Sequence, residues 1–436
     1  MFEENKFYLS HLASMKPAYK AVIRSQICSD KGVVLAKSGD VINSKVAQIL
    51  SKHHLEKPIF QSIDLNGAIN SNALYQFMIY LGEKKKGLQP ILEQSGFLPM
   101  LSQLCSVYGR LPELTQKLTV LSRKFPRVYY QAVFSAMAGT AIGMKLGMIQ
   151  SELEVVFLAG LFHDIGYLDL NPKLFSKDSY SPEEIRTLQM HPVLSRQCMD
   201  SIAGMSAEVG KAVLDHHECT DGTGYPQHKL GDQLSKFSQI VAITDLIADI
   251  YQRYRHHGDH VYQLIFTALQ FNKDLHIEEV YVAAAQLCKL VPESSEIPKG
   301  AVNGPLLERH KALMKTFVAV RDLVHPLLRA AEREVVGTLG SMIGRLSISL
   351  NSAGFLQTEY EAWLTDVETY PRDEDQHILL RASVMYDQVE SQLIHMRVLL
   401  DRLVRENPEH ETKMLRGLNL AFDQLNQLPT TYGRSY

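Results

Sequence analysis

Histidines and carboxylates gather in the middle of this 436-residue chain. Nine of its 17 histidines fall between residues 151 and 291, and several adjoin an acidic residue. Side chains of these types bind divalent metal ions through nitrogen and oxygen atoms. The candidate ligands, which come from four separate segments, are His163, Asp164, His191, His216, His217 and Asp245.

Two of the candidate carboxylates stand in apolar surroundings. Asp164 follows the run "VVFLAGLF" (155–162), and Asp245 lies within "QIVAITDLIADI" (239–250). An ionised carboxylate in such a setting is costly unless a cation or strong hydrogen-bond donors meet it. Bound metal ions would satisfy both carboxylates and the histidines together. Taken singly, each has a simpler explanation: Asp245 could pair with an arginine or lysine, and His191 could interact with a helix dipole.

The adjacent pair His216 and His217 indicates more than one ion. Neighbouring residues of a helix point about 100° apart, so a single ion rarely takes both. Two neighbouring ions can do so when one carboxylate bridges them. Such a pair lowers the pKa of a bridging water and clamps a phosphoryl group for in-line attack. The pattern therefore predicts phosphoester hydrolysis, with Asp164 and His163 as catalytic residues as well as ligands.

Four helices are expected to position these side chains. A capping box at Ser151 opens the helix that ends at the first His-Asp pair. A second box at Ser181, with proline at the first helical position, opens a helix that we expect to end at His191. A third helix, 207–217, closes at the paired histidines, and a fourth begins near Ser235 and carries the remaining carboxylate.

With these residues in place, the chain resembles the HD-GYP family, a bacterial branch of the HD phosphohydrolases. The resemblance covers about residues 120–290 and implies an all-helical domain whose metal centre hydrolyses cyclic di-GMP to the linear dinucleotide or to GMP. It implies two divalent ions of the iron, manganese or zinc class. The matching segments are "FHDIG" (162–166), "KDSYSPEE" (177–184), "MHP" (190–192), "HHECTDGTGYP" (216–226) and "IVAITD" (240–245).

The segment "HHECTDGTGYP" would place its two histidines on the metals at a helix end. Gly222 and Gly224 would let the following loop fold tightly, because they have no Cβ to block close approach of the backbone. Asp221 and Tyr225 would fix this loop or contact the substrate or a partner domain. Glu218 would orient a ligand histidine. The other loop or substrate contacts that the resemblance suggests are Pro226, Tyr167, Lys177 and Arg253.

The chain departs from the family pattern at several positions. Gln131 stands where the family has a histidine ligand, so one of the two ions should be weak or absent. Arg127 replaces a glutamate found in some members, which argues against a third ion. Tyr167 replaces a lysine that contacts phosphate, and Gln239 replaces an arginine. The segment "DIYQRYRHH" (249–257) replaces a segment of arginine, proline and tyrosine, and the candidate substitutes for the lost cation are Arg253, Arg255, His256 and His257.

These departures leave three functions open. The first is a cyclic di-GMP phosphodiesterase. The second is a degenerate receptor or interaction module that binds metal or nucleotide with little or no turnover. The third is an HD-type hydrolase acting on another phosphoester. The GYP segment also suggests GGDEF-type or other signalling proteins as partners of its loop.

The whole chain is expected to be mainly α-helical. Two short strands around the turn at Asp30 and Gly32, followed by a helix capped by Asn43, predict a small α+β module. A spacing of three and four from Met385 to Leu403 predicts a bundle of amphipathic helices. The expected division is a module at 1–65, a helical connector at 66–119, the HD-GYP domain at 120–291, a linker at 292–305 and a C-terminal helical bundle at 306–436.

The composition bears on the expected partners and cellular location of the protein. The net charge is −3, with acidic and basic residues well mixed, which favours neither a nucleic-acid partner nor a membrane partner. The five cysteines lack CxxC spacing and no long apolar run is present, so we expect a cytoplasmic protein. The C-terminal helices could support a homodimer.

Overall fold

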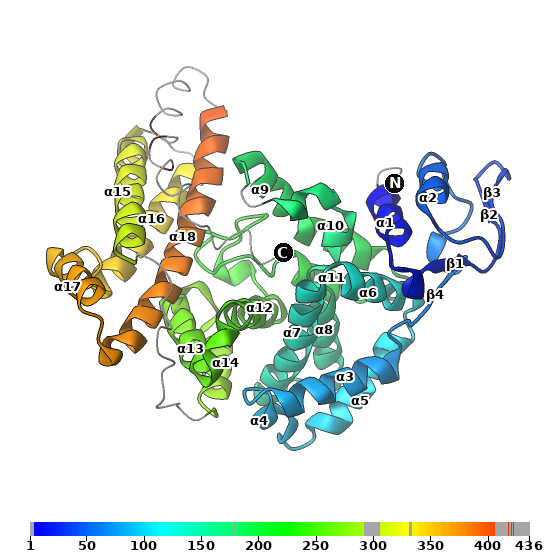
Figure 1. Ribbon diagram of the computed structural model, residues 1–436, viewed down its shortest axis with the longest axis horizontal. Helices are drawn as coiled ribbons and strands as arrows, with labels where there is room; N and C mark the ends of the chain where they lie inside the picture. Colours follow the sequence, from blue (N-terminus) through cyan, green and yellow to red (C-terminus); the bar gives the residue numbers. More distant parts are fainter. Residues whose placement is uncertain are drawn as a thin grey trace.

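The N-terminal part carries all the strands that the computed structural model describes; the described residues are 4–177, 180–291, 306–330 and 334–405, with Gly417, Leu420 and Phe422. Strand β1 (Ala21–Ile23) pairs antiparallel with β4 (Ile63–Leu65), and β2 (Ile27–Cys28) with β3 (Val34–Ala36). Helix α1 (Glu4–Ala13) precedes them and α2 (Ser44–Leu50) lies between β3 and β4. The predicted strand pair and the mainly helical fold class are confirmed (Figure 1).

Two helices accompany the strands of this module, one predicted and one not. Asn43 caps α2, since its side chain accepts hydrogen bonds from the amides of Lys45 and Val46, as predicted. Helix α1 was not expected. Its buried Tyr8, Leu9 and Leu12 do follow a helical spacing that could have revealed it.

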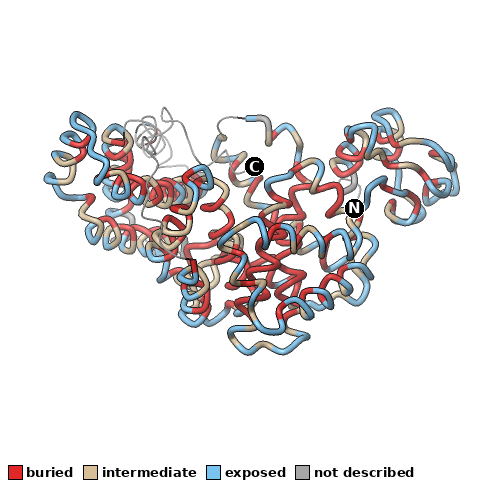
Figure 2. The backbone as a smooth tube through the Cα atoms, turned by 60° about the horizontal axis from the view of Figure 1, so that its bottom comes forward, coloured by how far each residue is buried: buried red, intermediate tan, exposed pale blue. Residues whose placement is uncertain are grey.

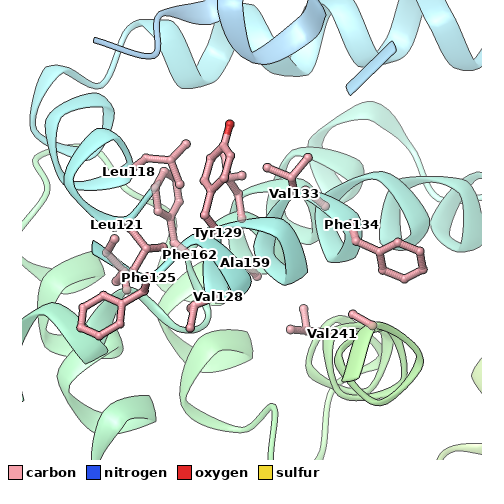
Figure 3. Packing of buried hydrophobic residues seen from close by; sticks show 14 of the residues in the cluster. Leu118, Leu121, Phe125, Val128, Tyr129, Val133, Phe134, Ala159, Phe162 and Val241 are labelled. Carbon is pink, nitrogen blue, oxygen red and sulfur yellow. The ribbon is translucent and has the colours of Figure 1, made fainter. Parts of the chain in front are cut away.

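A layer of long helices forms the centre of the molecule. Helices α7 (Pro126–Lys145) and α8 (Gln150–Phe162) lie against each other, and α12 (Lys236–Tyr254) packs across both. A Cβ added at Gly160 would lie 2.9 Å from the backbone nitrogen of Ala136, so glycine permits this close approach. Apolar side chains from the three helices meet between them (Figure 3). The start of α7 is thereby held beside the end of α8.

Shorter helices surround this layer. In the tube view, buried positions run through the central helices, and exposed positions line the outer parts of the molecule (Figure 2). The remaining helices of the central region are α3 (Ser71–Lys84), α4 (Gln89–Leu92), α5 (Phe97–Gly109), α6 (Pro112–Lys124), α9 (Pro182–Leu188), α10 (His191–Asp200), α11 (Ala207–Leu214), α13 (Val261–Phe271) and α14 (Glu278–Cys288). The 3₁₀ turns are η1 (Pro17–Tyr19), η2 (Ile59–Gln61), η3 (Ile165–Asp169), η4 (Pro172–Ser176), η5 (Gly231–Gln233), η6 (Arg255–His260), η7 (Lys273–Leu275) and η8 (Asp373–Asp375).

Helix boundaries near the candidate ligands differ in part from the prediction. The capping box at Ser181 is present. Helix α8 begins one residue earlier than expected, because Glu152 accepts a hydrogen bond from the amide of Ile149, 2.9 Å away. His191 begins α10 rather than ending the preceding helix, since Pro192 suits only a first turn. Helix α11 ends at Leu214, so the paired histidines lie in the turn after it.

The C-terminal helices form a second group with its own buried cluster. They are α15 (Leu306–Ala330), α16 (Glu334–Ser352), α17 (Thr358–Thr369) and α18 (Gln376–Arg405). The stripe predicted on α18 is core: Val389, Leu393 and Met396 are fully buried. The bundle lies beside the central helices, with α18 packed against α13 and α9 (Figure 1). The predicted linker at 292–305 and most of the chain beyond 405 lie outside the described residues.

A membrane-spanning helix would need a long apolar stretch. Within the described ranges, none of the helices combines the length and the apolar character that this requires.

Candidate metal centre

Four helices and the turns that follow them deliver the candidate ligands to one place. His163 is the C-cap of α8 and Asp164 follows it, while His191 opens α10. The paired histidines follow α11 and Asp245 lies within α12. Two groups of potential ligand atoms result, and within each group the atoms lie within 4.8 Å of one another. The first group is Asp164, His191, His216 and His217, and the second is His163, Asp164 and Asp245.

Three of the imidazoles are oriented by the backbone of their own segment. The Nδ1 atoms of His163, His191 and His216 lie 2.9, 2.8 and 2.6 Å from the carbonyl oxygens of the residues three positions before them. A carbonyl oxygen can only accept, so in each contact Nδ1–H donates. With Nδ1 engaged in this way, Nε2 is the ring atom left to bind a cation, and it is directed at the cluster. This arrangement is typical of histidine metal ligands.

The Nε2 atoms approach one another closely. His191 Nε2 lies 3.3 Å from His216 Nε2 and 3.2 Å from His217 Nε2. Two lone pairs at this distance repel each other unless a proton or a cation lies between them. Burial and the neighbouring imidazoles lower the pKa of His216 and of His217 well below the ordinary value, which disfavours the proton. The donor set therefore fits a divalent cation.

Asp164 connects the two groups. Its Oδ1 atom lies 3.1 Å from His191 Nε2, and its Oδ2 atom lies 3.4 Å from His163 Nε2. Burial by itself would raise the pKa of Asp164, but His163 and His191 hold that pKa well below its usual range. The carboxylate is therefore ionised and has one oxygen toward each group, as a bridging ligand requires.

The second group is poorer in ligands. His163 Nε2 lies 3.4 Å from Asp245 Oδ1 and has no hydrogen-bond partner among the described residues. Gln131, on α7, is buried and lines the same cavity. It therefore stands beside the cluster, and its neutral amide takes the place of an imidazole.

The two groups border a cavity of about 270 Å³. Asp164, His216, His217 and Asp245 form what we call the inner wall of this cavity. Asp387, Gln388 and Ser391 of α18 form the outer wall, more than 140 residues further along the chain. Sequence reasoning did not find the outer wall, because these polar residues lie off the apolar stripe of α18 and match no motif. It also missed His276, which lines the cavity and whose Nδ1 lies 3.3 Å from Gln239 Oε1.

The loop 218–226 packs against the paired histidines. Gly222 has φ of +76°, and a Cβ at Gly224 would overlap the Cα of Glu218, so both glycines are required for the fold of the loop. Tyr225 stacks on His217 with ring centroids 4.7 Å apart, and it lines the cavity. Pro226 follows through a cis peptide bond.

Two acidic side chains hold this loop in place. Glu218 accepts hydrogen bonds from the backbone amides of Gln227 and Lys229, 2.5 and 3.1 Å away. The interpretation of Glu218 as the partner of a ligand histidine is therefore wrong. Asp221 accepts hydrogen bonds from Thr223 and, at 2.8 Å, from Arg345 of α16.

The remaining predicted contacts divide between the cavity and the surface. Tyr167 is buried, lines the cavity and stacks on His191 with ring centroids 4.4 Å apart. Arg253 lines the cavity and pairs with Asp249 at 2.8 Å. Lys177 is exposed, pairs with Glu184 and is not among the described residues that line the cavity, a placement that does not favour a substrate contact.

Gln239 has a structural contact of its own. It is fully buried, and its Nε2 donates to the carbonyl oxygen of Glu218 at 3.1 Å. Gln239, which replaces an arginine of the family pattern, therefore connects α12 to the start of the loop 218–226.

Comparison with known proteins agrees with this geometry. Residues 106–263 match the model of a family described as "HD domain". The chain is 25% identical over 107 residues to the cyclic di-GMP phosphodiesterase response regulator RpfG of Xanthomonas campestris, which is 24% of this chain and 28% of RpfG. Residues 106–263 thus match an HD domain, and the chain resembles the HD-GYP family.

Two further relatives of the chain have related names. The cyclic di-GMP phosphodiesterase PdeB of Borreliella burgdorferi is 25% identical over 144 residues, 33% of this chain and 35% of PdeB. The 3'3'-cGAMP-specific phosphodiesterase 1 of Vibrio cholerae is 30% identical over 118 residues, 27% of each chain. The chain thus spans about a third or less of the length of these relatives.

A solved structure was also found to be similar. It is Bd1817, an HDG"Y"P protein from Bdellovibrio bacteriovorus, at a TM-score of 0.33 and 15% identity, covering 64% of this chain and 97% of Bd1817. At this level of similarity it carries no argument about the site.

Proposed function

We propose that this protein is a metal-dependent phosphodiesterase that hydrolyses cyclic di-GMP to the linear dinucleotide or to GMP. The observation that carries the proposal is the convergence of three Nε2 atoms beside the Asp164 carboxylate, with those of His216 and His217 lying 3.3 and 3.2 Å from that of His191. The names of the relatives, which are phosphodiesterases of cyclic di-GMP or 3'3'-cGAMP, support the choice of substrate.

The candidate ligands would bind two ions. His191, His216 and His217 would hold one ion and His163 with Asp245 the other, while Asp164 spans both. When bound, divalent ions of the iron, manganese or zinc class polarise a phosphoryl oxygen and make water acidic enough to attack at neutral pH. Burial of these ligands keeps bulk water away and strengthens the electrostatic interactions inside the cavity.

Phosphate binding would fall to the other residues of the cavity. Arg253 offers a guanidinium group on the cavity wall, and its carboxylate partner Asp249 lies one helical turn away on the same helix. Tyr167 supplies a hydroxyl group where the family has lysine, so it can donate a hydrogen bond but brings no charge. We therefore expect weaker phosphate binding than a lysine at position 167 would give.

The test measures metal content and hydrolysis on the same preparation. The full-length protein is loaded with manganese or iron, analysed for bound metal and assayed with cyclic di-GMP, with His216→Ala as the inactive reference. Metal in the wild type and release of linear dinucleotide or GMP well above the reference are expected. Turnover equal to that of His216→Ala would reject the phosphodiesterase.

A degenerate receptor is the second candidate, favoured by the side chains at three positions. Gln131, Tyr167 and Gln239 each replace a side chain that binds metal or phosphate more strongly, and Gln239 is committed to a backbone contact. A receptor would bind cyclic di-GMP without releasing product, and Gln131→His with Tyr167→Lys would raise its turnover. Turnover above about 1 per second by the wild type, a rate ordinary for enzymes, would reject it.

The domain boundaries and the partners are also proposals. We propose units at 1–65, 66–119, 120–291 and 306–436, which limited proteolysis would test through cleavage near 292–305. The family match begins at residue 106, inside the proposed connector. A GGDEF-type partner of the loop 218–226 would have to compete with Arg345, which already pairs with Asp221. Light scattering on the full chain would show whether it forms a homodimer.

A further inference from the structure

The outer wall belongs to a different part of the chain from the metal ligands. Helix α18 lies along the central helices, between them and the rest of the bundle (Figure 1). Its residues Asp387, Gln388 and Ser391 border the same cavity of about 270 Å³ as Asp164 and Asp245. Any molecule that reaches the metal ligands through this cavity therefore lies next to α18.

Specific contacts fix the wall in position. Gln388 Oε1 accepts a hydrogen bond from Asn272 Nδ2 at 2.9 Å, and Asn272 is itself buried and lines the cavity. Asp387 accepts one from Tyr254 at 2.7 Å and one from Arg309, also at 2.7 Å. These contacts are local to the cavity, so the register of α18 against α12 and α13 is set where a ligand would bind.

The two walls offer different chemistry. The inner wall presents carboxylates and imidazoles that would hold cations, which attract phosphate. On the outer wall, Arg309 and Tyr254 occupy the carboxylate of Asp387, which leaves the amide of Gln388 and the hydroxyl of Ser391 as neutral groups. The amide of Gln388 is uncharged, its Oε1 accepts from Asn272, and its NH₂ group remains to donate to an acceptor on the edge of a nucleobase.

The size of the cavity agrees with this division. Its volume of about 270 Å³ is at the lower end of pockets for small molecules, which span roughly 300–1,000 Å³. A cyclic dinucleotide has two bases and two phosphates, so it is too large to lie inside completely. A single nucleotide unit is closer to this size, and a phosphate held at the inner wall would bring its base toward the outer wall.

We propose that Gln388 and Ser391 contact the base of the nucleotide whose phosphate lies at the metal centre, so that the C-terminal bundle determines substrate specificity. This inference rests on the proposed function for its ligand. It assigns to two residues of α18 a role in nucleotide binding that the metal-ligand motifs do not contain.

The test compares two substrates on the full-length, manganese-loaded protein. Cyclic di-GMP carries a base, whereas bis(p-nitrophenyl) phosphate carries a phosphodiester without a base. Gln388→Ala is expected to raise the KM for cyclic di-GMP about tenfold, the effect of one hydrogen bond. Ser391→Ala is expected to raise it about threefold, since Ser391 lies at the exposed rim. The kcat for cyclic di-GMP and the KM for bis(p-nitrophenyl) phosphate should stay within twofold of wild type.

Two further variants separate base contact from support of the wall. Gln388→Glu keeps the oxygen that accepts from Asn272 but loses the amide donors, so it should weaken cyclic di-GMP binding as Gln388→Ala does. Arg381→Ala changes an exposed residue of the same helix and should leave both substrates unaffected. Equal losses on both substrates, or an unchanged KM for cyclic di-GMP in both Gln388 variants, would overturn the inference.

Calorimetric titration with cyclic di-GMP distinguishes this failure from failure of the proposed function. Weaker binding by the Gln388 variants, with no turnover by any protein, would support the base contact and reject the phosphodiesterase. Turnover by the wild type with unaltered binding by both Gln388 variants would support the phosphodiesterase and reject the base contact. Absence of binding and turnover in the wild type would reject both.

Discussion

The inner and outer walls of the cavity are held in place by different physical means. At the inner wall, the Nδ1 atoms of His216 and of the neighbouring His191 bond to the backbone of their own segments, and the Asp164 side chain is only 9% exposed. The outer wall depends on polar contacts between separate parts of the chain, such as Arg309 with Asp387, whose side chains are 16% and 2% exposed. The chemistry is thus built into rigid helix ends, whereas specificity depends on contacts that single substitutions can loosen.

Asp164→Ala should have the largest effect, because it removes the one carboxylate shared by both ligand groups. We expect turnover to fall roughly 100- to 10,000-fold, the range for loss of a positioned catalytic group, and bound metal to fall with it. Elemental analysis and a turnover assay measure the two effects. Asp200→Ala is the matched control, since Asp200 is exposed on α10 and pairs with Arg196. Unchanged metal content in Asp164→Ala would break the assignment of the inner wall.

Gln131→His should strengthen metal binding by the second ligand group, which contains His163, Asp164 and Asp245. An imidazole beside His163 and Asp245 adds a ligand, so metal affinity should rise. Residues that only hydrogen-bond to a metal ligand already change the affinity roughly tenfold, and we expect a gain of at least that size. Competition with a metal-sensitive dye measures the affinity. Gln150→His, at an exposed position of α8, should give no gain. Equal affinities in the wild type and Gln131→His would mean that position 131 does not reach an ion.

Arg345→Ala should act on the contact between the C-terminal bundle and the loop 218–226, with a smaller effect. Without the ion pair to Asp221, the bundle and the loop 218–226 are held less firmly, so the KM for cyclic di-GMP should rise about threefold with little change in kcat. A partly exposed ion pair contributes up to about 1 kcal/mol, which sets this scale. Arg345→Lys should recover part of the loss. Arg321→Ala removes an exposed pair with Asp322 and should change neither constant. A fall in kcat alone would place Arg345 in the chemistry instead.

His395 should give the smallest effect, a dependence of stability on pH. Its ring lies 5.8 Å from that of Tyr225, and burial lowers its pKa to about 4, with His228 and Arg345 adding to the shift. The pKa is lower in the folded state than in the unfolded state. The stabilisation is therefore present above about pH 6.5, and it is lost as the pH falls toward about 4.

Melting temperatures at pH 7.5 and pH 5 test this dependence. The wild type should lose stability between these two values, and His395→Gln should lose less. His377→Gln, at an exposed position of the same helix, should behave as the wild type. An identical loss in wild type and His395→Gln would remove His395 as the cause.

Much of the fold could be predicted because its signals are local. The Asn43 cap, the Ser181 capping box and the apolar stripe of α18 depend on residues within a few positions of one another. The errors arose where two local signals competed. Pro192 is typical of a first helical turn and indicates that α10 starts at His191. The prediction instead placed His191 at the end of the preceding helix.

The sequence by itself determined which side chains could bind metal, because the motifs place these types at helix ends whose directions follow from short-range hydrogen bonds. Only the tertiary structure decided that Gln388 and Ser391 face the same cavity as Asp164, more than 220 residues earlier in the chain. An amphipathic helix such as α18 has the same pattern wherever it docks. The position of its polar residues depends on packing between distant segments, and no local spacing encodes that packing.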